Sequence, residues 1–134
     1  MGDIYKLMTL LRRKQGTTHE QFKAYYENVH SKMGDKYLPP YCKKYLRHYL
    51  TPISPQMKAG QPPHPDFDAG VELWFDTEAD CKAFEASVSA PELVKEIIAD
   101  EDAFVDRSLI FRYRIEDHLS WGPPDPGKVL VKRQ

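Results

Sequence analysis

Four segments of the chain alternate apolar and polar residues in the way that half-buried β-strands do. The expected strands cover residues 4–11, 42–51, 70–75 and 109–115. In the first strand, the period of two places alternate residues on one face: Tyr5, Leu7, Thr9 and Leu11. Two helical stretches separate these strands, one before residue 42 and one after residue 75.

The first helical stretch begins with a capping signal. Thr17 and Thr18 are possible N-caps, with Glu20 or Gln21 three residues on, which is the capping-box pattern. Spacings of three and four then form one apolar stripe: Phe22, Tyr25, Tyr26, Val29 and Met33. We expect this helix to end near residues 33–34, ahead of two consecutive prolines at 39–40.

The second helical stretch is expected in two pieces. Thr77, with Asp80 three residues later, is a candidate N-cap for a helix that runs to about Val88. Pro91 suits the first turn of a new helix, which we expect to end at residues 100–102. The element order is therefore βαββαβ, which predicts the ferredoxin-like α+β fold, an antiparallel four-stranded sheet with helices on one face.

One face of such a sheet stays open. We expect that face to present apolar residues and pairable charges together: Met8, Leu10, Trp74 and Ile110 beside Glu72, Arg112 and Arg114. The opposite side of the last strand carries Phe111 and Tyr113. Mixed faces of this kind are usually covered, and a second copy of the sheet is the simplest partner. A twofold homodimer would close a barrel of eight strands.

Length and composition limit the functional classes. The 134 residues, 41% hydrophobic and 29% charged, predict one domain over residues 1–118 and a tail over 119–134. Residues 52–68 hold five of the eleven prolines and form a long loop of the kind used for lids or oligomer arms. A net charge of −1 argues against nucleic acid as a partner. No apolar run reaches the ~20 residues of a membrane span and no signal peptide is apparent, which predicts a cytoplasmic protein.

No phosphate-binding loop, dinucleotide fingerprint or metal-ligand spacing is present, so we expect chemistry without a cofactor or metal. Cys42 and Cys81 are expected to be free thiols. His30 is the first candidate catalytic residue, since it borders the apolar stripe of the first helix and an imidazole can exchange protons near neutral pH. The alternative is a histidine that caps the end of the helix.

His48 is the second candidate. It alternates with Leu46 and Leu50 on the second strand, where a histidine needs a polar partner or stays neutral. It could share one cavity with His30 and divide the acid and base roles, or be an ordinary core histidine. Aromatic residues concentrate in the same region and could line a pocket for a flat phenolic ligand, or simply pack the core. The candidate substrate-binding residues are Tyr5, Phe22, Tyr26, Tyr49 and His118.

Four segments resemble the EthD-like members of the dimeric α+β barrel superfamily. They are residues 5–14, 18–30, 44–49 and 103–108, and the segment 18–30, THEQFKAYYENVH, looks like a characteristic helix of that family. Within that family the chain looks like short fungal proteins that tailor aromatic polyketides, some of them assigned as decarboxylases of atrochrysone carboxylic acid. The resemblance implies a homodimer without a metal, one cavity per subunit, a catalytic His30 and, on a looser match, His48.

The expected reaction is therefore decarboxylation of an aromatic polyketide acid. His30 would act as general acid and base, and His48 would polarise a ketone oxygen with help from Tyr26 or Tyr49. Dehydration, aldol cyclisation and cofactor-free oxidation of an anthrone are alternatives in the same cavity, because each starts with proton removal beside a carbonyl. A dimeric protein that binds such a ligand without changing it is the non-enzymatic alternative.

Overall fold

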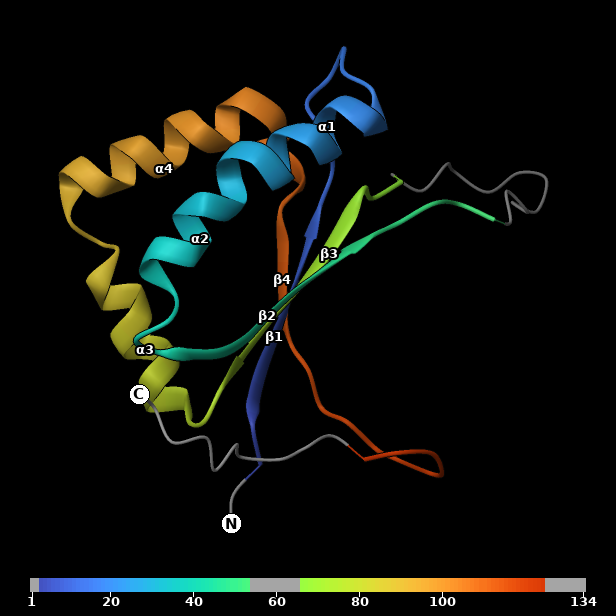
Figure 1. Cartoon of the computed structure of the whole chain (residues 1–134), viewed down its shortest axis with the longest axis vertical. Helices are drawn as coiled ribbons and strands as arrows, with labels where there is room; N and C mark the ends of the chain where they lie inside the picture. The colour runs from blue at the N-terminus through green and yellow to red at the C-terminus, as the bar shows by residue number, and fades with distance from the viewer. Residues whose placement is uncertain (1–2, 54–65, 125–134) are drawn as a thin grey trace.

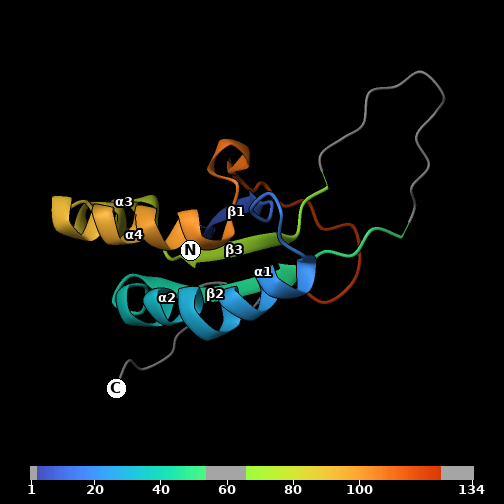
Figure 2. The same cartoon turned by 90° about the horizontal axis from the view of Figure 1, so that it is seen from above.

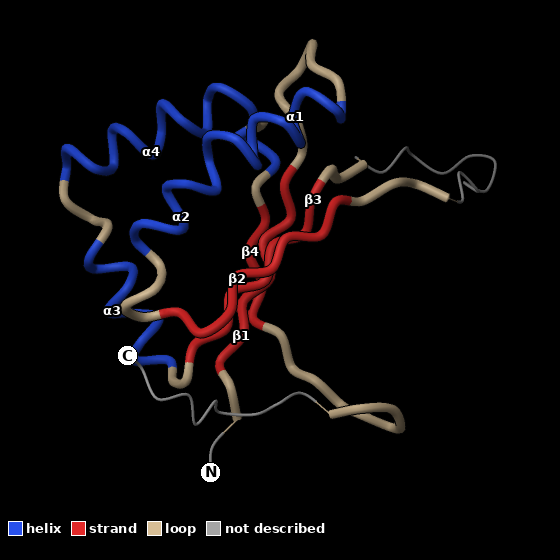
Figure 3. The backbone as a smooth tube through the Cα atoms, in the orientation of Figure 1, coloured by secondary structure: helices blue, strands red, loops and turns tan. Residues whose placement is uncertain are grey.

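In the described part of the chain, the backbone forms one antiparallel sheet of four strands, with the four labelled α-helices on one side of it (Figures 1 and 3). The computed structural model describes residues 3–53 and 66–124. The strands are β1 (Tyr5–Leu11), β2 (Cys42–Tyr49), β3 (Ala69–Phe75) and β4 (Phe111–Arg114), in the spatial order β2-β3-β1-β4. The predicted ferredoxin-like fold is confirmed.

Two helical runs cover the sheet and lie side by side (Figure 2). The first run comprises α1 (His19–Tyr25), the π-helical segment η1 (Tyr26–His30) and α2 (Ser31–Tyr37). The second comprises α3 (Glu78–Ser87) and α4 (Pro91–Phe104), followed by the short 3-10 turn η2 (Arg107–Leu109). In residues 3–53 and 66–124, no helix combines the length and apolar character needed to cross a bilayer.

The helix starts follow the expected signals. Thr18 caps α1 in a complete capping box, because its hydroxyl accepts from the Gln21 amide and the Gln21 side chain accepts from the Thr18 amide. Thr77 caps α3 by accepting from the Asp80 amide. Pro91 occupies the first turn of α4, where its missing N–H costs no hydrogen bond.

The first helical run is longer than predicted. It continues past Gly34 to Tyr37 and ends at Leu38, just before the prolines. Gly34 is retained inside the helix because it lets Tyr45 of β2 come close: a Cβ on Gly34 would lie 2.6 Å from Tyr45 Cε2. The π-helical turn also changes the phase of the helix, and Val29, predicted in the apolar stripe, is 47% exposed.

The predicted faces of the last strand are reversed. β4 pairs with β1 so that Thr9 lies opposite Arg112, which puts Arg112 and Arg114 on the helix side of the sheet. Phe111 and Tyr113 therefore lie on the open face, where both are exposed. Strand alternation misled here because β4 is an edge strand, whose two faces are both only partly covered. The helix α4 also ends later than expected, at Phe104 instead of residues 100–102.

The core lies between the helices and the sheet. Its larger cluster joins α1 and η1 to the end of α4 through Phe22, Tyr26 and Phe104. A smaller cluster joins Leu7 and Phe75 to Cys81 of α3. Both cysteines are free, as expected. The first cluster fixes the relative positions of η1 and α4, from which the candidate site is built.

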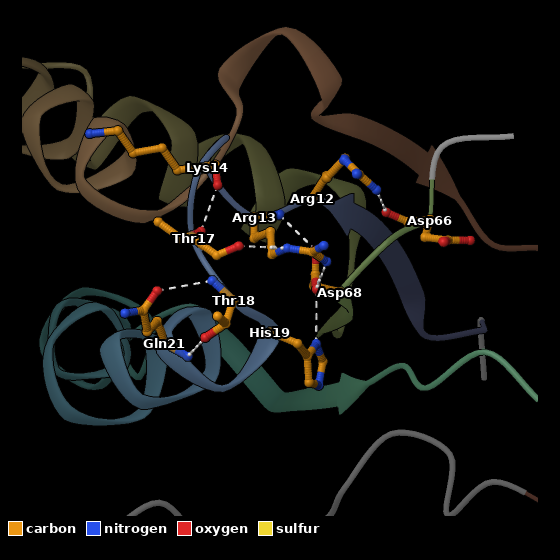
Figure 4. Close-up of polar contacts among 9 residues, drawn as sticks. All are labelled: Arg12, Arg13, Lys14, Thr17, Thr18, His19, Gln21, Asp66 and Asp68. Atoms are coloured by element: carbon orange, nitrogen blue, oxygen red, sulfur yellow. Dashed lines mark hydrogen bonds and ion pairs between the residues drawn. The ribbon is translucent and has the colours of Figure 1, made fainter. Parts of the chain in front are cut away.

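A buried carboxylate joins the end of the proline-rich stretch to the β1–α1 turn. Asp68 accepts hydrogen bonds from the Arg13 amide (2.7 Å), from Arg13 Nη1 (3.0 Å) and from His19 Nδ1 (2.8 Å), as Figure 4 shows. Burial alone would raise the pKa of Asp68, but these hydrogen bonds together lower it. Within the proline-rich stretch, residues 54–65 lie outside the described residues, so its predicted role as a lid or arm stays a prediction.

Candidate functional site

A cavity of about 240 Å³ lies between the helices and the sheet. Its wall is mostly apolar and draws on β1, β3 and both helical runs. Representative apolar residues are Leu11, Met33, Val71, Leu73, Ile97 and Phe104. Polar groups enter the wall at a few positions only, which is the usual composition of a small-molecule site. Those positions decide what the cavity can do chemically.

His30 lines this cavity and is held by a buried carboxylate. Its Nδ1 is hydrogen-bonded to Oδ2 of Asp100 on α4, whose side chain is only 8% exposed. Because a carboxylate can only accept, Nδ1 carries the proton, and Nε2 is the ring nitrogen available to a bound molecule. The ring also contacts Tyr26 and Phe104, with centroid separations of 4.7 and 4.9 Å. These contacts fix both the tautomer and the orientation of the imidazole.

The second oxygen of Asp100 has its own partner. The Tyr25 hydroxyl donates to Oδ1 over 2.9 Å, and the Tyr25 ring stacks on Phe104 at 4.9 Å. The pKa of Tyr25 is raised by burial and by its hydrogen bond to this carboxylate. Both oxygens of Asp100 are thus hydrogen-bonded, which holds the carboxylate in place and orients the His30 ring.

Two tyrosine hydroxyls form the other polar element of the wall. The Tyr26 and Tyr45 oxygens are 2.6 Å apart, and both residues line the cavity. Burial, together with the neighbouring hydroxyl, raises the pKa of Tyr26 well above its usual value, and burial also raises the pKa of Tyr45, so both phenols stay protonated. Each phenol has one proton, so a pair joined by one hydrogen bond retains one O–H for a further acceptor. That acceptor can be a carbonyl oxygen of a bound molecule.

An ion pair behind the tyrosines supports them. The Arg47 guanidinium lies 4.9 Å from the Tyr45 ring centre and 5.7 Å from that of Tyr26. It donates two hydrogen bonds of 2.7 Å to Glu27, which also accepts from the Tyr49 hydroxyl. The hydrogen bonds from Arg47 are the main cause that lowers the pKa of Glu27 to about 2. This network fixes the tyrosine pair from outside the cavity.

Glu101 and Arg112 add charged groups to the lining, which also includes Thr9 and Tyr37. Glu101 follows Asp100 on α4, and burial raises its pKa although Arg107, His30 and Arg112 oppose the change. Arg112 reaches the cavity from β4, and its side chain is 59% exposed. Arg112 forms an ion pair with Glu85, in which Nη1 of Arg112 lies 3.8 Å from Oε2 of Glu85. The cavity therefore offers a base, a hydroxyl pair, a carboxyl group and a guanidinium.

His48 does not reach this cavity. It lies opposite Gly70 in the β2–β3 register, which places it on the open face of the sheet, away from His30. Its Nε2 is bonded to Glu72 over 2.5 Å, and Glu72 also accepts from the Trp74 indole. The expectation that His30 and His48 share one cavity is wrong for this chain, because the two histidines lie on opposite faces of the sheet.

The candidate substrate-binding residues separate in the same way. Tyr26 lines the cavity, whereas Phe22 is buried in the core beside it. Tyr5 packs at the far end of the helix face, under the Arg114 guanidinium at 4.8 Å. Tyr49 is held by Glu27. His118 is exposed beyond β4, where it bonds Glu116 and borders a groove on the open face.

Sequence reasoning placed Tyr45 in an aromatic cluster that could line a cavity, but it missed Asp100, Glu101 and Arg112 as site residues. A signal existed for the two acids, since they are spaced three and four residues from Ile97 and so share its face of the helix. Adjacent acids in a helix are usually solvated, which is why the pattern did not mark them. The position of Arg112 depends on the β1–β4 register, and local alternation does not contain that information.

The fold and the site together define the class: a ferredoxin-like α+β protein with a histidine–carboxylate pair in a cavity under its helices. The EthD domain family matches residues 14–108, more than half of the chain, and this chain belongs to that family. No curated protein matches the sequence.

Solved structures share the fold at low sequence identity. The chain is similar to an EthD family protein from Bacillus halodurans, with 17% identity and a TM-score of 0.55 over 86% of this chain and 99% of that one. HapK from Hahella chejuensis shares 11% sequence identity with this chain, with a TM-score of 0.55 over 90% of this chain and 98% of HapK. A dimeric ferredoxin-like protein of unknown function from Thermobifida fusca shares 16% sequence identity, with a TM-score of 0.52 over 86% of this chain and 92% of that one.

Proposed function

We propose that this chain is a cofactor-independent carboxy-lyase that removes carbon dioxide from a flat aromatic acid of the fungal polyketide type. The observation that carries the proposal is His30, bonded to the buried Asp100 and lining a mostly apolar cavity. A pair of this kind supplies a proton acceptor and donor near neutral pH. Membership of the EthD family and the resemblance to decarboxylases of atrochrysone carboxylic acid support the choice of substrate.

The reaction divides between two parts of the wall. The bond between the carboxylate and its neighbouring carbon breaks, carbon dioxide leaves, and the electron pair moves onto the adjacent carbonyl oxygen as an enolate. The free O–H of the Tyr26–Tyr45 pair donates to that oxygen. One well-placed donor is worth about 2.7–4 kcal/mol in a well-studied hydrolase. The tyrosine pair takes the polarising role that the sequence assigned to His48.

His30 completes the reaction by protonating carbon. Its imidazolium, stabilised by Asp100, transfers the Nε2 proton to the enolate carbon and returns to the neutral form. Solvent then restores the proton. The apolar wall keeps water away from the enolate while it exists.

The proposal includes a homodimer that pairs the open faces of two sheets. That face carries exposed apolar side chains, including Phe111 and Tyr113. The Thermobifida fusca protein of the same fold is described as dimeric. Burying apolar area of this kind is the usual reason for association.

Product analysis tests the proposed reaction. Purified protein is incubated with a β-keto acid of the hydroxyanthrone type, and carbon dioxide and product mass are followed. One equivalent of carbon dioxide per product, lost with His30→Ala, supports the proposal. Loss of water instead indicates dehydration or cyclisation, and uptake of dioxygen indicates anthrone oxidation. Tight binding with unchanged ligand mass indicates a binding protein and would falsify the proposed activity.

A further inference from the structure

We propose that Arg112 determines how the substrate enters the cavity, by pairing with the carboxylate of a flat aromatic acid at the cavity mouth. This inference rests on the proposed function, because it names the residue that recognises the acidic group of that substrate. The cavity wall is mostly apolar. Among the described residues that line it, Arg112 is the one that carries a guanidinium group.

The register of the sheet puts Arg112 in this place. Thr9 lies directly opposite Arg112 across β1 and β4, and both residues line the cavity. Arg114, two residues on, shares the same face but packs over Tyr5 and does not line the cavity. The two arginines thus have the same strand, the same face and the same charge, and differ in access to a bound molecule.

Arg112 is also available to a ligand. Its side chain is 59% exposed and its partner Glu85, at 3.8 Å, is 53% exposed. Exposed ion pairs with such long separations are weak, since water screens both charges. A carboxylate whose aromatic ring enters the apolar cavity adds burial to the same charge interaction and can displace Glu85. The planar fork of a guanidinium matches both oxygens of that carboxylate.

The groups next to Arg112 are those that the reaction needs. Glu101 interacts electrostatically with both Arg112 and His30, and all three residues line the cavity. A substrate anchored at Arg112 has its carboxylate at the mouth and its rings inside. Carbon dioxide then forms at the solvent side, while the enolate stays inside with the tyrosine pair.

Anchoring of this kind acts on binding more than on the chemical step. The guanidinium holds the carboxylate in the ground state, and that contact weakens as the negative charge moves to the enolate oxygen. Loss of Arg112 should therefore raise KM and leave kcat unchanged or higher.

Binding of two unreactive probes tests the inference. Anthraquinone-2-carboxylate and anthraquinone-2-carboxamide share the flat ring system and differ in charge, and their affinities are measured by calorimetry on the full chain. We expect the wild type to prefer the carboxylate. Arg112→Gln should lose about tenfold in affinity for the carboxylate and keep its affinity for the amide, as expected for loss of one charged pair. Added salt should weaken the carboxylate alone.

Two variants serve as controls. Arg112→Lys should recover part of the carboxylate affinity, and Arg114→Gln should match the wild type. Equal carboxylate affinity in wild type, Arg112→Gln and Arg114→Gln overturns the inference and leaves the proposed function standing. If neither probe binds, the proposal that the cavity takes a flat aromatic molecule is contradicted, and so is the inference about Arg112. Circular dichroism confirms that each variant is folded.

Discussion

On each side of the sheet, a histidine is bonded to a carboxylate. On the helix face, the side chains of His30 and Asp100 are 22% and 8% exposed, and they border a cavity. On the open face, the side chains of His48 and Glu72 are 40% and 17% exposed, and His48 does not line this cavity. The same two functional groups therefore differ in what surrounds them.

The difference shows that a histidine–carboxylate pair becomes useful for catalysis through its surroundings. Asp100 has a second partner in Tyr25, and a free ring nitrogen of His30 is left for a guest. On the open face, Glu72 is likewise bonded to both His48 and the Trp74 indole, so what distinguishes the first pair is the cavity that His30 lines. A third pair, His19 with Asp68, joins two segments of the backbone. We therefore expect chemistry from the first pair and structural roles from the others.

Replacing each of the two histidines with alanine, one at a time, is the strongest test of this comparison. His30→Ala should lower kcat by about 10²–10⁴-fold, which is the usual contribution of one positioned acid or base. His48→Ala should leave kcat close to that of the wild type. Both are measured with the aromatic acid substrate. Equal losses in the two variants would show that the cavity does not distinguish the pairs.

Removing the carboxylates tests the same contrast one step further from the substrate. Asp100→Asn should lower kcat by about 10²-fold or more, because an amide can present N–H to Nδ1 and favour the wrong tautomer of His30. Nitrogen NMR shifts of the His30 ring report the tautomer directly. Glu72→Gln is the matched change on the open face, and activity near that of the wild type is expected there. A normal tautomer in an inactive Asp100→Asn would contradict this explanation.

Asp68→Asn should act on stability alone. It removes a buried charge that has three hydrogen-bond donors, and we expect a loss of about 3 kcal/mol in the free energy of unfolding. Urea unfolding measures the loss. Asp66→Asn is the control, because Asp66 contributes its backbone carbonyl, which accepts from Arg12 over 2.5 Å.

The same variant has a pH signature. The pKa of Asp68 is lowered in the folded state, so the unfolded chain binds more protons in acid. Wild-type stability from this group is present above the ordinary carboxyl pKa and is lost as pH falls through the folded pKa. Asp68→Asn should lack that part of the acid sensitivity, and an unchanged acid profile would contradict the assignment.

Glu27→Gln should give the smallest effect. The pKa of Glu27 is lowered from about 4.5 to about 2, mainly by Arg47, so its stabilisation should disappear as pH falls through that window. The side chain is 39% exposed, and water screening limits the loss at neutral pH to about 1 kcal/mol or less. Thermal unfolding between pH 5 and 2 compares it with the exposed Glu20→Gln. A larger cost would mean that the network behind the tyrosines stabilises the fold more than its exposure suggests.

Much of the fold could be predicted from the sequence because its signals are local. The capping box at Thr18, the N-cap at Thr77 and Pro91 at the start of α4 each act within one helical turn. The four strands were found at nearly their true positions by the period of two. Gly34 was misread because its function is tertiary, the close approach of Tyr45 to the helix.

The candidate site was predictable only in part. His30 was identified because it borders an apolar stripe that lies within one helix. Its partner Asp100 is 70 residues away in the chain, and no local pattern connects the two. His48 was assigned to the same cavity because strand alternation reports two faces without saying which one the helices cover.

The sequence by itself determined the order of the elements, the starts of the helices, and the position of one histidine on the buried side of a helix. These depend on capping, proline and apolar spacing, which act over a few residues. Only the tertiary structure decided that Asp100, Tyr45 and Arg112 meet His30 around one cavity, and that His48 lies on the other face. Those outcomes depend on strand register and on packing between segments distant in the chain, where a shift of one residue reverses every side chain.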